Sequence, residues 1–180
     1  MKKLIAFLTL SLLFISCLKP RLSIPTGKVW GYKPVYSTDS SLLFVRAVGP
    51  QPVKYPAKIY AKGNLVFQND LGFGIHVVDN KDPSSPVRIG FLQLKGNSEM
   101  SIKGNYLYAN SFTDLVIIDI SDWQHPFEVQ RLHYAFLQGS SSYLFIPLPE
   151  HNVYYGCVSF NEGIQTGWIR DSVDRHCYYP

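Results

Sequence analysis

The sequence has little of what a helical or nucleic-acid-binding protein needs. Outside its N-terminus, no stretch shows a long amphipathic helical period. Charged residues make up only 17% of the 180 positions, and the formal net charge is a mild +4. No basic stripe is interleaved with aromatic residues, so nucleic-acid binding has little support.

Motifs for catalysis and for metal binding are also missing. The sequence contains five histidines, but none has the H-x-x-x-H or H-E-x-x-H spacing of a metal site. There is no G-x-S-x-G, the turn that carries the nucleophile of α/β-hydrolases. His151, Cys157, His176 and Cys177 match no strong zinc template. We therefore predict no catalytic residue, no metal and no cofactor, and a protein that is not an enzyme.

What is present favours β-structure in a globular chain of about one domain. Hydrophobic residues make up 46% and aromatic residues 14% of the sequence. Many of them are Tyr, Phe, Val and Ile, which are enriched in strands. The composition predicts an all-β fold.

The N-terminus has the pattern of a secretory signal. Lys2 and Lys3 precede an apolar stretch that is too short to span a bilayer stably, and the stretch ends in FISC at Cys17. These residues resemble the lipobox of bacterial lipoproteins, although Phe14 departs from the usual leucine. The resemblance implies that residues 1–16 are removed and that Cys17 carries a lipid; the alternative is ordinary cleavage with Cys17 as a chance residue. We expect attachment to the cell envelope, at the outer membrane, with the membrane face left open.

Residues 17–50 are predicted to form a tether. Pro20, Pro25, Pro34 and Pro50 lie there among Ser, Thr and Lys, and a single strand is expected at residues 42–45.

A repeat follows the tether. KIYAKGNLVFQND, beginning at Lys58, aligns with EMSIKGNYLYANS, beginning at Glu99, so Gly63 and Gly104 are 41 positions apart. GIHVVDNKDPSSPV then aligns with DLVIIDISDWQHPF, with an offset of 40 residues between Asp79 and Asp119. Each unit divides into four strand-like pieces, and Gly-Asn between the first two is typical of a tight hairpin. Four short strands in about forty residues predict a β-propeller blade or a blade-like sheet in a solenoid.

The two signature stretches resemble the LVIVD repeat of bacterial and archaeal surface proteins, over roughly residues 57–134. Together with the lipobox, they resemble the LVIVD-repeat lipoproteins of Bacteroidetes. The resemblance implies a propeller-like envelope lipoprotein, and it brings no catalytic residue. We assign residues 51–134 to two repeats and residues 135–180 to a degenerate third repeat or cap. Strands are expected there at residues 143–147, 152–160 and 163–169.

The aspartates of the signature are interpreted as turn residues. Each follows a buried strand, where its side chain can accept backbone N–H bonds. Equivalent residues in every repeat indicate a role in folding, whereas calcium would need more oxygen ligands than DNKD and DISD supply. The predicted turn residues are Asp79, Asp82 and Pro86 in the first unit and Asp119, Asp122 and Pro126 in the second.

Aromatic residues in loops are the candidates for contact with a partner. Trp123 follows Asp122 at a turn, and Phe73 and Phe112 occupy matching loop positions. They could touch a protein or a glycan, or they could pack against a neighbouring blade. Cys157 and Cys177 could form a disulfide in an oxidising compartment or remain unrelated thiols.

The leading functional hypothesis is a non-enzymatic scaffold at the envelope that presents loops to a protein or glycan. A closed propeller needs at least four blades, about 160 residues, so we also expect either a homo-oligomer or the truncated product of a longer repeat gene. The alternative from another class is a ligand-binding or hydrolytic propeller.

Overall fold

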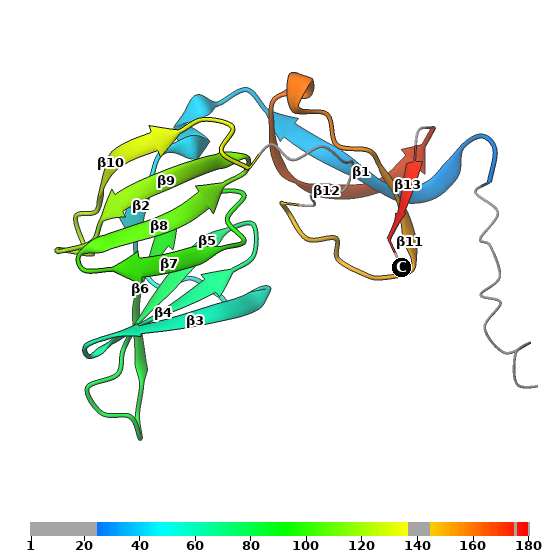
Figure 1. The fold of residues 1–180 in the computed structure, drawn as a ribbon. Helices are drawn as coiled ribbons and strands as arrows, with labels where there is room; N and C mark the ends of the chain where they lie inside the picture. The colour runs from blue at the N-terminus through cyan, green and yellow to red at the C-terminus, as the bar shows by residue number, and fades with distance from the viewer. Residues whose placement is uncertain (1–24, 137–144, 175, 180) are drawn as a thin grey trace, which may run out of the picture.

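The computed structural model describes residues 25–136, 145–174 and 176–179. The signal sequence and Cys17 therefore lie outside the described residues, as do Tyr143 and Leu144 of one expected strand. The described chain is all-β and forms three antiparallel or mixed sheets (Figure 1). Among the described residues, none of the helices has the length and apolar character needed to cross a membrane.

The first repeat unit forms the first sheet. Its strands are β3 (Pro56–Lys62), β4 (Leu65–Asp70), β5 (Gly74–Asp79) and β6 (Val87–Gln93), which follow one another as an antiparallel meander. Gly63 and Asn64 make the predicted two-residue hairpin, in which Gly63 has a φ of 57°. Glycine suits this left-handed position because it has no Cβ to clash with the backbone.

The second repeat unit forms the second sheet in the same way. Its strands are β7 (Met100–Lys103), β8 (Tyr106–Ser111), β9 (Asp114–Asp119) and β10 (Phe127–Leu132). Phe67 pairs with Val77 in the first sheet, and the aligned Tyr108 pairs with Ile117 in the second. The structure thus superimposes the two units as the sequence alignment does, and the expectation of two blade-like four-stranded units in an all-β chain is confirmed.

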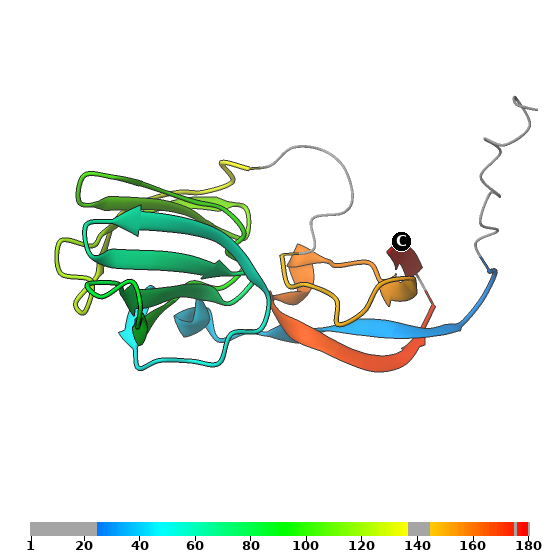
Figure 2. The ribbon, with the colours of Figure 1, turned by 90° about the horizontal axis from the view of Figure 1, so that it is seen from below.

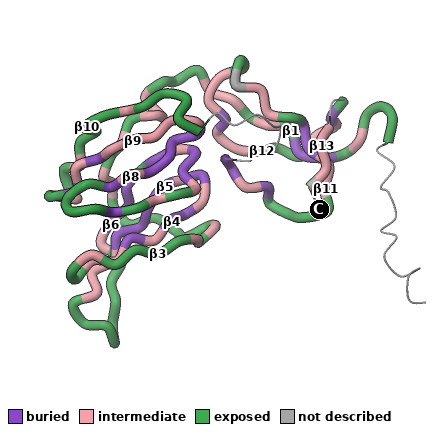
Figure 3. The backbone as a smooth tube through the Cα atoms, in the orientation of Figure 1, coloured by how far each residue is buried: buried purple, intermediate pink, exposed green. Residues whose placement is uncertain are grey.

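The two sheets pack face to face and bury the main core between them. The inner strands β4, β5, β8 and β9 are buried or half-buried along most of their length, whereas β3 and β10 at the edges are mostly exposed (Figure 3). The core is made by apolar side chains that alternate along the strands: Phe67, Ile75, Val77, Leu92, Leu94, Ile102, Leu107, Ala109, Val116, Ile118 and Ile120. This is the packing of neighbouring propeller blades.

Residues 29–48 do not form the predicted tether. β1 (Val29–Ser37) pairs along its whole length with β12 (Ile164–Val173) in the third sheet. None of residues 42–45 forms the expected strand, and the first two of them belong to a short 3₁₀ helix, η2 (Ser40–Leu43). β2 (Arg46–Val48) adds a fifth strand to the first sheet, beside β6. The partner strand of β1 is distant in sequence, so no local pattern signals the pairing, and the density of prolines favoured a tether.

The third sheet contains the C-terminal strands and has the order β12-β1-β11-β13. β11 (Val153–Gly156) runs parallel to β1, and β13 (His176–Tyr179) pairs with β11. This order is not the meander of a blade, so these strands are not a third copy of the repeat. Residues 145–147 are not a strand either. The strand expected at residues 152–160 ends at Gly156, and its last expected residue begins the 3₁₀ helix η3 (Phe160–Glu162).

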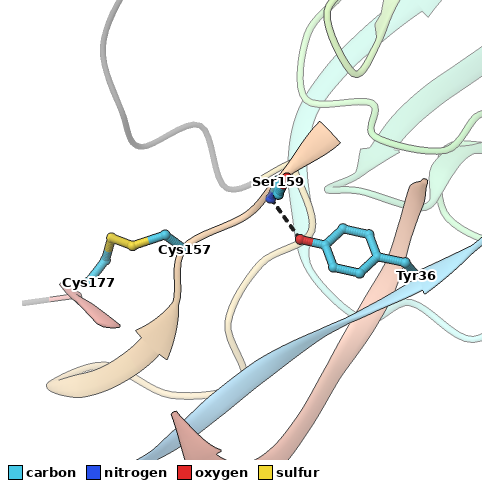
Figure 4. Close-up of a disulfide and its surroundings, with 4 residues drawn as sticks. All are labelled: Tyr36, Cys157, Ser159 and Cys177. Carbon is cyan, nitrogen blue, oxygen red and sulfur yellow. Dashed lines mark hydrogen bonds between the residues drawn. A yellow bond between two sulfur atoms is a disulfide. The ribbon is translucent and has the colours of Figure 1, made fainter. Parts of the chain in front are cut away.

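The third sheet lies to one side of the blade pair (Figure 1). It is tied internally by a disulfide between Cys157 and Cys177, whose Cα atoms are 5.7 Å apart (Figure 4). The Ser159 amide donates to the Tyr36 hydroxyl over 2.7 Å in the same region (Figure 4). Phe145 packs edge-to-face on Phe112 and the Trp168 indole donates to the Ile146 carbonyl, so this segment connects the blade pair to the third sheet.

Candidate functional site

The blade pair has two loop-bearing edges with different chemistry. One edge, here called the turn edge, carries the Gly-Asn hairpins and the aspartate turns that follow β5 and β9. The opposite edge, the network edge, carries the loops β4–β5, β6–β7 and β8–β9. Backbone bonds join loops of the network edge: the Gly72 amide donates to the Asn97 carbonyl, and the Gly96 amide donates to the Gly72 carbonyl.

At the turn edge, the aspartates hold the backbone. The carboxylate of Asp79 accepts from the amide of Lys81 over 3.0 Å, and that of Asp119 accepts from Ser121 over 2.7 Å. Asp82 and Asp122 accept in the same way from the amides two residues later. These are the bonds of Asx turns.

The electrostatics of the turn edge agree with this geometry. Hydrogen bonds from Ser84 lower the pKa of Asp82, and those from Ser121 lower the pKa of Asp119. The hydrogen bond with His125 does the same for the pKa of Asp122. Pro86 and Pro126 each stand immediately before the returning strand, β6 or β10. All of these groups serve the turns.

At the network edge, three asparagines are buried and linked. Asn69 donates to the side chain of Asn97, whose own amide donates to the carbonyls of Glu99 and Asn110 over 2.9 and 3.0 Å. The Asn110 side chain accepts from the amides of Ser98 and Glu99. The buried Asn110 side chain thereby pairs with the amides of Ser98 and Glu99 in the β6–β7 loop, which fixes the path of the chain from one sheet to the next.

Asp70 and His76 form a buried pair beside this network. His76 Nε2 lies 3.1 Å from Asp70 Oδ2, and both side chains are almost fully buried. Asp70 also accepts from the backbone amides of Tyr55 and Lys54, at 2.6 and 3.1 Å. These two amides belong to the segment that leads from β2 across the first sheet to β3 (Figure 2). The pair therefore fixes the position of residues 49–55, here called the crossing segment, and this segment in turn shields the pair from solvent.

A basic-aromatic cluster lies at the surface above the pair. The Phe73 ring stacks on Tyr55 with 6.1 Å between ring centroids. The ammonium nitrogens of Lys54 and Lys95 lie 4.3 and 5.0 Å from the centroid of the same Phe73 ring. Burial, followed by the nearby charge of Lys54, lowers the pKa of Lys95. None of the ion pairs among the described residues includes either lysine.

Of the three aromatic residues predicted to touch a partner, only Phe73 belongs to the basic-aromatic cluster. Phe112 is just 9% exposed, because it packs against Gly96 and Phe145. Trp123 packs against the core, and its ring covers Gly90 of the first sheet so closely that a Cβ there would be 2.3 Å from it. The partner interpretation is therefore wrong for Phe112, and the packing alternative describes Trp123.

Sequence reasoning missed both lysines of the cluster. A signal was available, since Lys54 and Lys95 are themselves 41 positions apart and each precedes the first strand of its unit. It was hidden because residue 54 lay at the margin of the predicted tether, before the alignment began.

A second missed feature is a pocket of about 430 Å³ at the outer rim of the two sheets. It is lined by Ser40, Leu43, Phe44, Val45, Asp114, Glu128, Arg131 and His133. Burial alone would lower the pKa of Arg131, but hydrogen bonds with Glu128 and Asp114 raise it. Its guanidinium also donates to the Leu43 carbonyl over 3.1 Å, so this arginine clamps the segment 40–45 to the second sheet.

Among the described residues, no group of three His, Cys, Asp or Glu side chains could hold a metal ion. The comparisons with known proteins agree with the blade geometry. Residues 97–133, which are the second sheet and the loop that leads into it, match the LVIVD repeat family. No curated protein and no solved structure matches the chain significantly. The second unit is thus similar to an LVIVD repeat.

Proposed function

We propose that this chain is a non-enzymatic lipoprotein scaffold of the cell envelope that binds an anionic group on a protein or glycan partner. Export and lipid attachment are supported by the N-terminal signal pattern and by the FISC motif at Cys17. The disulfide between Cys157 and Cys177 supports an oxidising compartment, since such bonds are rare in reducing ones.

The observation that carries the binding proposal is the pair of lysines held against one phenylalanine. Two ammonium groups repel each other, and this repulsion contributes to the lowered pKa of Lys95. The Phe73 ring, which stacks on Tyr55, holds the two charges together through cation–π contact with each lysine. A carboxylate or sulfate bound between the ammoniums would remove the repulsion, and its binding would be favoured by both charges.

The rest of the blade pair supports a scaffold rather than an enzyme. The turn-edge aspartates are engaged in Asx turns, and Asp70, His76 and the three asparagines are engaged in buried hydrogen bonds. These aspartates, His76 and the asparagines thus serve the fold, whereas Lys54 and Lys95 belong to none of the ion pairs among the described residues.

Replacing both lysines by glutamine should abolish most of the binding to acidic polymers. We expect wild-type chain to bind polyglutamate, an acidic peptide, or alginate, an acidic glycan, in a salt-dependent manner. The variant Lys54→Gln/Lys95→Gln should bind roughly tenfold more weakly, because two exposed charge contacts of about 0.5–1 kcal/mol each are lost. Fluorescence anisotropy with labelled polymers measures both affinities, and the polymer that binds more tightly identifies the class of partner.

Lys28→Gln/Lys33→Gln is the matched control, because it removes the same net charge from exposed positions outside the cluster. If it weakens binding as strongly as the cluster variant, the attraction comes from net charge and the proposal fails. It also fails if the wild-type chain binds neither polymer.

Lipid attachment at Cys17 is tested separately. Expressed in a bacterial host and fed with an alkyne-labelled fatty acid, the wild-type chain should incorporate label and fractionate with membranes. Cys17→Ser should lose the label, whereas Cys157→Ser should keep it. Label on the Cys17→Ser variant would show that the lipid is attached elsewhere, and an unlabelled wild-type chain would contradict attachment altogether.

A further inference from the structure

The face of the first sheet that packs on the second sheet, here called the forward face, is apolar and fully covered. It consists of Leu65, Phe67, Ile75, Val77 and Leu92. The last four of these side chains have no exposed area. In this molecule the forward face of a unit therefore takes the next unit in the chain as its partner.

The second sheet has the same forward face, but nothing among the described residues covers it in this way. The aligned residues are Tyr106, Tyr108, Leu115, Ile117 and Leu132. Tyr106 is 41% and Leu132 is 43% exposed, whereas Leu92, the counterpart of Leu132, is 0% exposed. The other three side chains, Tyr108, Leu115 and Ile117, are only partly buried, so the described residues leave this apolar face incompletely covered.

The first sheet has the complementary open face. The second sheet receives the first through its rear face, which consists of Ile102, Leu107, Ala109, Val116 and Ile118. The aligned residues of the first sheet are Ala61, Val66, Gln68, His76 and Val78. His76 lies under the crossing segment, whereas Ala61 is exposed and Val66 and Val78 are partly exposed. The crossing segment resembles the β6–β7 loop. Each covers only the part of a rear face that lies at the network edge, and the rest of that face is left for packing.

Polar contacts at the edge of the interface also recur in a second copy. Within the chain, Lys58 pairs with Glu99, and Lys62 Nζ donates to Asn105 Oδ1 over 3.1 Å. Suppose that the forward face of the second sheet met the rear face of another copy. Glu99, which is the counterpart of Lys58 in the second unit, would then face the other copy's Lys58. Lys103 would likewise meet the other copy's Asn64, since the Lys-Gly-Asn sequence is the same in both units. Both contacts remain complementary.

We infer that the open forward face binds a second copy of this chain through that copy's rear face. The interface is head-to-tail, so each copy keeps one face of each kind and the assembly closes only as a ring. Propellers contain four to eight blades, so two-bladed copies form rings of two to four chains.

Two contacts at the interface between copies differ from those within the chain. Ser101 stands in place of Tyr60, whose hydroxyl donates to the Ile102 carbonyl within the chain, and Pro83 stands in place of Trp123. The inference is independent of the anionic ligand proposed above.

The experiment is the mass of the full-length chain in mild detergent, by light scattering with the detergent contribution subtracted. The wild-type chain should have two to four times the mass of one chain. Ile117→Lys places a charge on the forward face of the second sheet, and Val78→Lys places one on the rear face of the first. Each variant alone should be monomeric, while Ile169→Lys, on the exposed surface of the third sheet, should leave the mass unchanged.

Mixing the two variants distinguishes the head-to-tail interface from its rivals. Each variant retains one intact face, so an equimolar mixture of Ile117→Lys and Val78→Lys should give a dimer and nothing larger. An unchanged Val78→Lys assembly would mean that two forward faces bind each other, which overturns the proposal. A monomeric wild-type chain also overturns it. A circular dichroism spectrum and a melting temperature close to those of the wild type show in each variant that the two sheets remain folded and packed.

Discussion

Asp70 and Asp79 lie on the same hairpin, yet their carboxylates have different hydrogen-bonding roles. Asp79 lies at the turn edge and accepts one backbone amide. Asp70 is buried and accepts two backbone amides and the imidazole of His76. Removing a buried acceptor lowers the free energy of unfolding more than removing an exposed one, because the donors left without a partner cannot form hydrogen bonds with water.

This difference predicts the cost of removing each aspartate. Asp70→Ala should lower the free energy of unfolding by about 3 kcal/mol, since two amides and a histidine lose their partner in a buried place. Asp79→Ala should cost about 1 kcal/mol or less, because water can replace its carboxylate. Urea denaturation followed by circular dichroism measures both. Equal losses would mean that Asp70 does not pin the crossing segment.

Elements in this chain are joined by contacts between sheets as well as by hydrogen bonds within them. Trp123, in the turn that precedes β10, packs on Gly90 of β6 in the other sheet. The absence of a side chain at residue 90 makes the space for the indole, so the two residues work as a pair. The exposed edge strand β10 is thus attached to the blade pair through its own turn.

Trp123→Ala should therefore destabilise the packing of the two sheets. We expect a loss of about 2 kcal/mol, less than for a fully buried tryptophan because Trp123 is partly exposed. The matched control is Trp30→Ala, in which the indole is 72% exposed; its loss should stay below about 0.5 kcal/mol. Thermal unfolding of the two variants gives the comparison, and similar melting temperatures would contradict the packing role.

On the scale of the whole molecule, the chain is a blade pair and a separate third sheet that contains the first and last strands. The third sheet has a much smaller core, of Tyr32, Leu148 and Tyr155, than the blade pair. Its disulfide joins two neighbouring strands, β11 and β13, through cysteines that are 20 residues apart in sequence. A small core with a covalent link is the usual arrangement where apolar burial alone is insufficient.

The double variant Cys157→Ser/Cys177→Ser should consequently loosen the third sheet and leave the blade pair intact. Closing a loop of this length contributes about 3 kcal/mol through the entropy of the unfolded chain. Amide hydrogen exchange should show faster exchange in β11 and β13 and unchanged protection in β4 and β5. Faster exchange throughout the chain would mean that the two parts unfold as one.

Local patterns determined the two blades from the sequence alone. Each unit forms four strands, as expected, with the Gly-Asn hairpin between the first two. The hairpin at Gly104 and the Asx turn at Asp119 were also evident, because each depends on residues close together in the chain. Such features follow from alternation of side chains, from glycine at positive φ and from aspartate beside a free amide.

Only the tertiary structure decided the contacts between distant segments. β1, near the start of the described chain, pairs with β12 near its end, and neither strand signals the other in the sequence. The cluster of Lys54, Phe73 and Lys95 likewise arises because the crossing segment and two loops meet at one edge. The two forward faces carry the same apolar pattern, yet one is buried and the other is open. Periodicity specifies which residues share a face, whereas the folded chain determines what lies opposite that face.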